Sequence, residues 1–236
     1  MNYNPTVTED DGSCEYPLGF NTCGDPVSYQ GYDYATVQIG EQCWFAENLR
    51  NENYENGDAI PSNLSDSEWS STTSGALAVY GEDAGCTDNS PDIDACDPAQ
   101  SLNEYGRLYN WYAVDDARGL CPSSWHVPTD GEWTVLTDHL GGVYEAGGQM
   151  KTTYGWSYNG VNGTNSSGFS GLPGGIHSGS NGSFFNAGLY GYWWSSSPLG
   201  SSAWLRSLSH FDDDIVLVNY YNPQNGLSVR CIKDSN

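Results

Sequence analysis

Residues 127–133 read Val-Pro-Thr-Asp-Gly-Glu-Trp and mark the start of a helix. Thr129 and Glu132 have the spacing of a capping box, in which each side chain accepts a hydrogen bond from the backbone N–H of the other residue. An apolar stripe at helical spacing follows and ends at two glycines: Trp133, Leu136, Leu140, Gly141 and Gly142. We interpret this stripe as the side of the helix that faces the core.

Outside this helix the sequence predicts strands, turns and one more short helix. Alternating side chains in residues 34–39 and 43–46, around Gly40, predict a hairpin. The stretch from Leu108 to Asp115 has apolar residues at helical spacing and predicts the second helix. Four further strands are expected in the last quarter of the chain: residues 192–196, 203–209, 215–220 and 227–232.

Three stretches carry weaker signals of regular structure. Residues 1–22 are polar and are expected to form a linker or small module before a domain at residues 23–236. Residues 51–104 hold Ser, Thr and Gly clusters and an acidic loop, which indicates an irregular insertion in that domain. Residues 141–192 are rich in Gly, Ser and Asn, but they are too aromatic to be simple disorder, so we expect long ordered loops.

The charge of the chain excludes some partners. With 30 acidic and 7 basic residues the net charge is −23, so phosphate backbones and anionic membrane surfaces are repelled. No apolar run approaches the length of a membrane span. Divalent cations and neutral polymers such as polysaccharides remain as partners that this charge admits.

Six blocks of the sequence resemble the Fibrobacter succinogenes major paralogous domain family: residues 37–49, 106–113, 119–133, 168–175, 192–197 and 228–231. This family is similar to the C-type-lectin-like fold and to the formylglycine-generating-enzyme-like proteins. The resemblance implies an α+β domain in which two short helices flank a small, twisted, mostly antiparallel sheet, with long loops rich in Gly, Ser and aromatic residues on one side.

A second resemblance covers residues 1–16. They are similar to a short module of secreted, surface-bound Bacteroidetes proteins, which has a further cysteine just before the position of Asn2. The resemblance implies that Cys14 has lost its partner and that the chain is part of a longer modular protein. An extracellular or cell-surface location is then expected, with a signal peptide upstream of this chain.

Seven cysteines in a secreted protein indicate about three disulfides and one leftover thiol. Closure of the acidic loop favours a Cys86–Cys96 bridge. The fold resemblance implies a Cys121–Cys231 bridge between the loop before the helix capped by Thr129 and the last strand. Cys23–Cys43 completes the set with Cys14 free, and Cys14–Cys23 is the rival pairing.

Catalysis is not expected from the pattern of histidines and cysteines. Enzymes related by fold use a cysteine pair for copper or three histidines for iron, and neither site transfers to this sequence. His126 fits a structural role, and His139 falls on the exposed side of its helix. An alternative metal site would combine His139 with His177 and His210, although no close ligand spacing supports it.

Clustered carboxylates are candidate calcium ligands, because calcium prefers hard oxygen atoms. The candidates are Asp10 and Asp11, Asp92 and Asp94, and Asp212, Asp213 and Asp214. None of these clusters matches an EF-hand loop, and solvated acidic turns are the competing interpretation. Calcium is therefore the one cofactor that the sequence suggests.

Aromatic rings in the loops are candidate ligand contacts, because they stack on sugar rings or pack against a protein partner. The candidates are Trp156, Tyr158, Phe184, Phe185 and Tyr190. Trp193 and Trp194 lie in a family block and are expected in the core.

Together these features predict an extracellular binding or adhesion module for a polysaccharide or a surface protein, with loops between residues 141 and 192 as the binding face. Two alternatives belong to other classes. One is a structural subunit of a surface assembly or filament. The other is a metal-dependent enzyme of the formylglycine-generating type.

Overall fold

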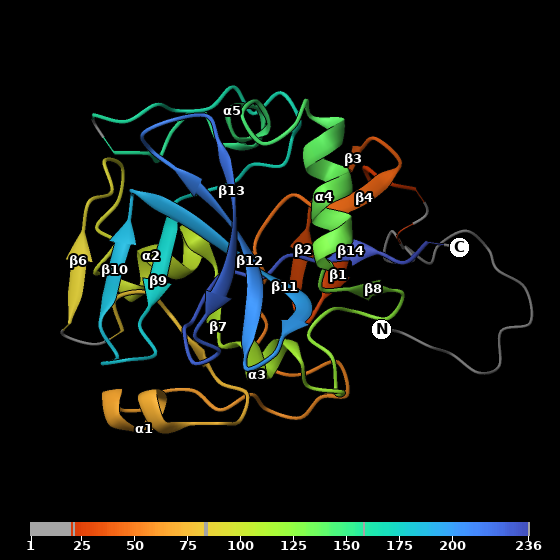
Figure 1. Cartoon of the computed structure of the whole chain (residues 1–236). Helices are drawn as coiled ribbons and strands as arrows, with labels where there is room; N and C mark the ends of the chain where they lie inside the picture. The colour runs from red at the N-terminus through yellow and green to blue at the C-terminus, as the bar shows by residue number, and fades with distance from the viewer. Residues whose placement is uncertain (1–19, 21, 83–84, 158, 236) are drawn as a thin grey trace, which may run out of the picture.

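The computed structural model describes residues 20, 22–82, 85–157 and 159–235, and the chain has an α+β architecture (Figure 1). Asp10, Asp11, Cys14 and Tyr158 lie outside the described residues. The helices are all short: α1 (Asp66–Ser71), α2 (Pro98–Tyr105), α3 (Trp111–Val114), α4 (Asp130–His139) and α5 (Ala146–Met150). None of the helices in this part of the chain has the length and apolar composition needed to cross a membrane.

A three-stranded antiparallel sheet lies at the centre of the molecule (Figure 1). Its strands follow one another along the chain: β11 (Tyr190–Leu199), β12 (Ser202–Ser209) and β13 (Ile215–Tyr221). Trp193 and Trp194 of β11 are fully buried and belong to different core clusters. Successive side chains of a strand point to opposite faces, so these two rings anchor both faces of the sheet in the core.

A four-stranded antiparallel sheet beside α4 brings early and late segments of the chain together. Its order is β3 (Thr36–Ile39), β4 (Gln42–Phe45), β14 (Ile232–Lys233) and β8 (Trp125–His126). β3 and β4 form the predicted hairpin, and Gly40 supplies the positive φ of +61° that its turn requires. The last strand of the chain, β14, thus lies between β4 and β8, which come earlier in the sequence.

The stretch expected to be an irregular insertion contributes regular structure. β6 (Cys86–Asp88) pairs in parallel with β10 (Phe184–Ala187), which pairs antiparallel with β9 (Gly174–His177), at the left of Figure 1. Two smaller sheets are β1 (Val27–Tyr29) with β2 (Tyr32–Tyr34), and β5 (Leu77–Ala78) with β7 (Leu108–Tyr109). Trp69, Tyr80 and Tyr105 pack with Phe184 in a separate buried cluster, so this part of the chain has its own small core.

The expectation of two helices is wrong, because the described residues contain five. Ser65 and Asp97 cap α1 and α2 by accepting hydrogen bonds from first-turn amides, and α5 forms without a side-chain cap. The helix expected from Leu108 begins at Trp111 instead, since β7 pairs with β5 and Asn110 caps α3. The strand expected at residues 227–232 does not form as one element: Leu227 and Ser228 make isolated bridges, residues 229–231 lie in neither a strand nor a bridge, and Ile232 begins β14.

α4 begins with the capping box that the sequence predicts. The Thr129 hydroxyl accepts from the amide of Glu132 at 3.2 Å, and the Glu132 carboxylate accepts from the amide of Thr129 at 2.8 Å. Arg206 of β12 ties this end of the helix to the central sheet, because its guanidinium donates to the Asp130 carboxylate at 2.7 Å.

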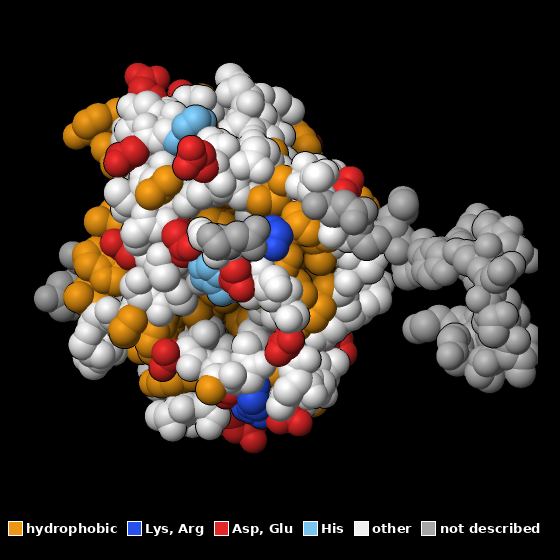
Figure 2. Space-filling model, turned by 90° about the vertical axis from the view of Figure 1, so that its right-hand side faces the viewer, with side chains coloured by type: hydrophobic (Ala, Val, Ile, Leu, Met, Phe, Trp, Pro, Cys, Tyr) orange, Lys and Arg blue, Asp and Glu red, His pale blue; other side chains and the backbone are white. Residues whose placement is uncertain are grey.

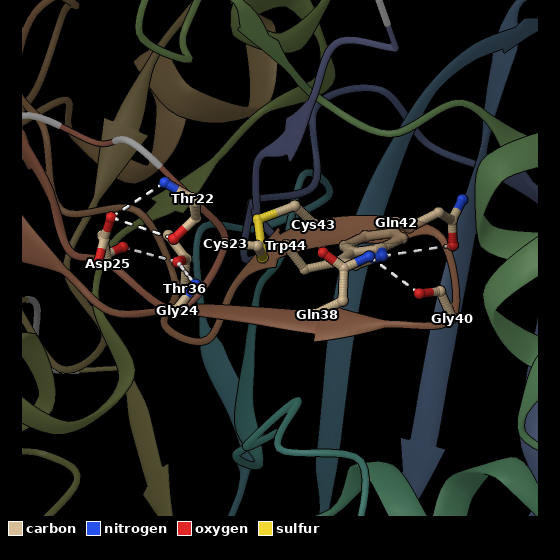
Figure 3. Close-up of a disulfide and its surroundings, with 10 residues drawn as sticks. All are labelled: Thr22, Cys23, Gly24, Asp25, Thr36, Gln38, Gly40, Gln42, Cys43 and Trp44. Atoms are coloured by element: carbon tan, nitrogen blue, oxygen red, sulfur yellow. Dashed lines mark hydrogen bonds between the residues drawn. A yellow bond between two sulfur atoms is a disulfide. The ribbon is translucent and has the colours of Figure 1, made fainter.

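Three disulfides join the described residues in the pairs expected from the sequence: Cys23–Cys43, Cys86–Cys96 and Cys121–Cys231. Figure 3 shows the first of these at the edge of the β3–β4 hairpin. Beside it, the Thr36 hydroxyl accepts from the Gly24 amide at 2.9 Å and donates to the Asp25 carbonyl at 2.7 Å. The bridge and these bonds hold the segment before β1 against the hairpin.

One buried amide connects three of the family blocks, and we call this arrangement the Asn48 hub. The Asn48 side-chain oxygen accepts from the Trp193 indole at 2.8 Å and from Arg230 Nε at 2.9 Å. Its nitrogen donates to the Tyr105 carbonyl at 2.9 Å. The Arg230 guanidinium is fully buried, stacks 4.0 Å from the Phe169 ring and donates to carbonyl oxygens, including that of Ser170 at 2.8 Å.

Replacing Asn48 by Ala should lower the free energy of unfolding by about 3 kcal/mol or more, because it leaves an indole N–H and a buried guanidinium without their acceptor. Urea denaturation measures this loss. Asn103→Ala is the matched control, since Asn103 is exposed and its removal should change stability by less than about 0.5 kcal/mol. Equal losses for the two variants would show that the hub does not stabilise the fold.

Candidate functional site

A polar pocket of about 330 Å³ lies over the Asn48 hub, and we call it the central pocket. Its lining comes from five separate parts of the chain: residues 32–35, 46–50, 103–104, 152–172 and Arg230. Because the hub holds three of these parts in place, the pocket has a fixed floor. Its walls come from the end of α2 and the segment after α5.

Two guanidinium groups face the central pocket. Arg50 donates to the carbonyl oxygens of Leu102 and Asn103 at the end of α2 and lies 4.6 Å from the Tyr32 ring. Its Nε–H is buried and has no partner among the described residues. Arg230 donates to carbonyl and amide oxygens. Burial of its charged group lowers the pKa of Arg230 to about 9.

Two carboxylates balance these charges. Glu47 accepts from the Tyr32 hydroxyl at 2.6 Å and from the Ala35 amide at 2.9 Å, and it lies 4.0 Å from Arg50. Glu104 lines the wall formed by α2. Hydroxyl and amide groups of Thr152, Asn165 and Ser170 complete the lining. The pocket therefore offers many hydrogen-bond donors and acceptors with no net charge.

Tyr154 stands at the rim of the central pocket with 49% of its surface exposed. Partial burial raises the pKa of its hydroxyl, and the carboxylates of Glu104 and Asp92 raise it further. A half-exposed ring beside a polar pocket is a surface on which a ligand ring can stack. Sequence reasoning identified the loop that carries Tyr154 but selected its neighbour Trp156.

Two of the aromatic candidates do not face solvent, so their prediction as ligand contacts is wrong. Trp156 is 1% exposed, and its indole donates to the Thr152 hydroxyl at 3.1 Å. Phe184 is also 1% exposed and stacks 4.0 Å from the ring of His177. Trp156 belongs to a loop that packs into one core cluster, and Phe184 belongs to β10 and packs into another, so both rings are covered. Of the other candidates, Phe185 is at the surface, while Tyr190 is half-buried and stacks on Tyr192.

The described part of the chain contains no group of three or more His, Cys, Asp or Glu side chains arranged to hold a metal ion. Asp92 accepts from the Gly155 amide at 2.8 Å, and Asp94 accepts from the Cys96 amide at 3.0 Å. These carboxylates fix loop backbone instead of pointing to a shared centre.

At Asp212–Asp214 the positive charge is the ammonium group of Lys151. The buried Lys151 ammonium donates to the carbonyl oxygens of Val161 at 2.8 Å, Ser209 at 3.2 Å and Asp212 at 2.6 Å. It also pairs with the Asp213 carboxylate at 3.1 Å. The protein therefore supplies its own positive charge to this turn.

Lys151→Met should lower the free energy of unfolding by about 3 kcal/mol, because three carbonyl groups and a carboxylate lose the buried charge that they surround. Lys233→Met is the control, since that ammonium lies beside the Phe20 and Trp125 rings and its loss should cost about 1 kcal/mol.

Thermal unfolding of the wild-type chain should be unchanged by EDTA. A large drop in Tm on chelation would instead indicate a bound metal in this turn.

His126 is held between two carboxylates, so both of its ring nitrogens have partners. Its Nδ1 lies 2.6 Å from Asp234 and its Nε2 lies 2.9 Å from Glu132. The hydrogen bond to Glu132 raises the pKa of His126. Burial alone would raise the pKa of Glu132, but hydrogen bonds from His126 and Thr129 outweigh it and hold that pKa at about 2. Figure 2 shows this side of the molecule, where acidic side chains surround two histidines.

The raised pKa of His126 makes stability depend on pH. The ion pairs stabilise the fold fully below the unfolded pKa of about 6.5 and are lost as pH rises through the higher folded pKa. His126→Gln should flatten the fall in stability above neutral pH, as measured by urea denaturation at a series of pH values. His139→Gln, on the exposed side of α4, should keep the wild-type profile. An unchanged profile in His126→Gln would contradict the role of this clamp.

The alternative three-histidine site is not formed. His177 is buried between Trp69 and Phe184, and burial lowers its pKa to about 4. His210 packs against Tyr190 and Phe211, and His139 is exposed on α4. No metal-binding group among the described residues brings these three side chains together.

The model of a family described as the Fibrobacter succinogenes major domain matches residues 37–233, which is most of the chain. The matched segment contains the Asn48 hub, α4 and nearly all of the central pocket. Neither the curated proteins nor the solved structures contain a match to this sequence.

Proposed function

The chain belongs to the Fibrobacter succinogenes major domain family, and from that premise we propose that it is an extracellular, non-catalytic module that binds a neutral polysaccharide in the central pocket. The observation that carries the proposal is the combination of a charge-balanced polar pocket with the half-exposed ring of Tyr154 at its rim. Sugars present hydroxyl groups for hydrogen bonds and flat apolar faces for stacking, and this surface offers both.

The charges of the protein favour an uncharged ligand. A net charge of −23 repels anionic polymers at long range. Within the pocket, Arg50 and Arg230 are balanced by Glu47 and Glu104, so a neutral ligand meets no uncompensated local charge. Hydroxyl groups of a ligand can donate to the carboxylates and exchange hydrogen bonds with the hydroxyl and amide groups of Thr152, Asn165 and Ser170.

The cysteines and the arrangement of the loops support an extracellular location and a lectin-like relationship. Disulfides persist in oxidising compartments, and three of them join the described residues. We assign the domain to the C-type-lectin-like class because short helices flank small antiparallel sheets, the last strand lies between early strands, and long loops line the pocket.

A structural subunit of a surface assembly is the second candidate, and one observation favours it. β13 is an edge strand of the central sheet, and its Val216 and Leu217 side chains are exposed. Exposed apolar edge strands pair readily with another chain. Concentration-dependent assembly that is abolished by Val216→Lys would favour this candidate.

Tyr154→Ala should weaken binding of a neutral polysaccharide about tenfold, because the stacking ring is lost, and should leave Tm nearly unchanged. Affinity electrophoresis against neutral glucan and xylan gels measures the change. Tyr144→Ala is the matched control, since Tyr144 is 75% exposed and lies outside the pocket.

The same assay tests whether ligand binding depends on a metal ion or on the central pocket. Binding should persist in EDTA, since the described acidic clusters bind backbone or Lys151. Retention by anionic polymers alone, or equal retention by wild type and Tyr154→Ala, would contradict binding in the central pocket.

A further inference from the structure

A second hollow, of about 260 Å³, is adjacent to the central pocket at Tyr154, and we call it the outer hollow. It shares Thr153 and Tyr154 with the central pocket. Its remaining polar groups include Asp92, Ser157 and Asn162. Tyr154 therefore borders two polar depressions, and we call this shared border the ridge.

The backbone of Tyr154 is fixed on both sides. Its carbonyl accepts from the Thr152 hydroxyl at 2.6 Å, and the next amide, of Gly155, donates to the Asp92 carboxylate at 2.8 Å. Gly155 has a φ of +86°, which favours glycine at this position. Asp92 lies in the loop closed by Cys86–Cys96, so that disulfide also supports the ridge. A backbone held in this way loses little conformational entropy when a ligand covers it.

The chemistry of the outer hollow matches that of the central pocket. It offers a carboxylate, a hydroxyl and a carboxamide, which suit sugar hydroxyl groups. The Tyr154 hydroxyl is close enough to the carboxylates of both hollows that Glu104 and Asp92 each raise its pKa. The two hollows are therefore neighbours along one surface.

We propose that the central pocket and the outer hollow are adjacent subsites for one linear chain of neutral sugar units, which crosses the ridge at Tyr154. This inference rests on the proposed function and adds a requirement for an extended ligand. The module then recognises a stretch of a polymer, and its affinity increases with the number of units until both subsites are filled.

Calorimetric titration with linear gluco- and xylo-oligosaccharides, from disaccharide to hexasaccharide, tests the proposal. For the wild-type chain the Kd of the series that binds should fall at least about tenfold from disaccharide to hexasaccharide. A double variant, Ser157→Ala with Asn162→Ala, should lose most of this gain and keep the disaccharide affinity. Ser180→Ala with Asn181→Ala is the matched control, because these residues line neither hollow.

The outcomes separate the two proposals. Disaccharide binding without a gain in affinity for longer oligosaccharides would overturn the second subsite and leave the proposed function standing. A gain with length that survives in the Ser157/Asn162 variant would also overturn the subsite. Failure of every oligosaccharide to bind would remove the proposed function itself.

Discussion

The side-chain amide of Asn48 is the contact on which the rest of the structure depends. Its oxygen accepts one hydrogen bond from the Trp193 indole, in the central sheet, and one from the Arg230 guanidinium, in the segment before the last strand. A buried guanidinium is costly unless its N–H groups are satisfied, and here amide and carbonyl oxygens satisfy them. This requirement fixes the position of the loop that carries Phe169 and Ser170. The fold and the floor of the central pocket therefore come from the same set of bonds.

The loops around the central pocket are held in place by specific contacts of their own. Lys151 replaces a metal ion in organising the turn at Asp212, and Asp92 fixes the backbone next to Tyr154. Asp92 and Asp213 thus take part in positioning loops, and Asp92 does so beside the exposed Tyr154 ring. In the proposed function, the charge-balanced pocket of this strongly acidic protein would favour ligands that carry no charge.

Features that depend on short sequence spacing could be predicted, and features that depend on packing could not. The capping box at Thr129 and the hairpin around Gly40 are local, and their residues determine them directly. Exposure of a ring in a Gly- and Ser-rich loop depends on where the loop folds, so Trp156 could not be distinguished from Tyr154. The caps of α1 and α2 were present in the sequence, but the composition around them favoured loops. The central pocket draws on five segments, and no spacing along the chain brings these together.

Hydrogen–deuterium exchange of the chain with and without a neutral linear hexasaccharide tests the central claim most directly. The account predicts slower exchange at residues 103–104, 152–155 and 162–165, which border the ridge and its two hollows. Exchange in β12 and β13, which line neither hollow, should be unchanged. Protection confined to β13, or the absence of protection around Tyr154 under saturating binding, would contradict the assignment of this surface as the ligand site.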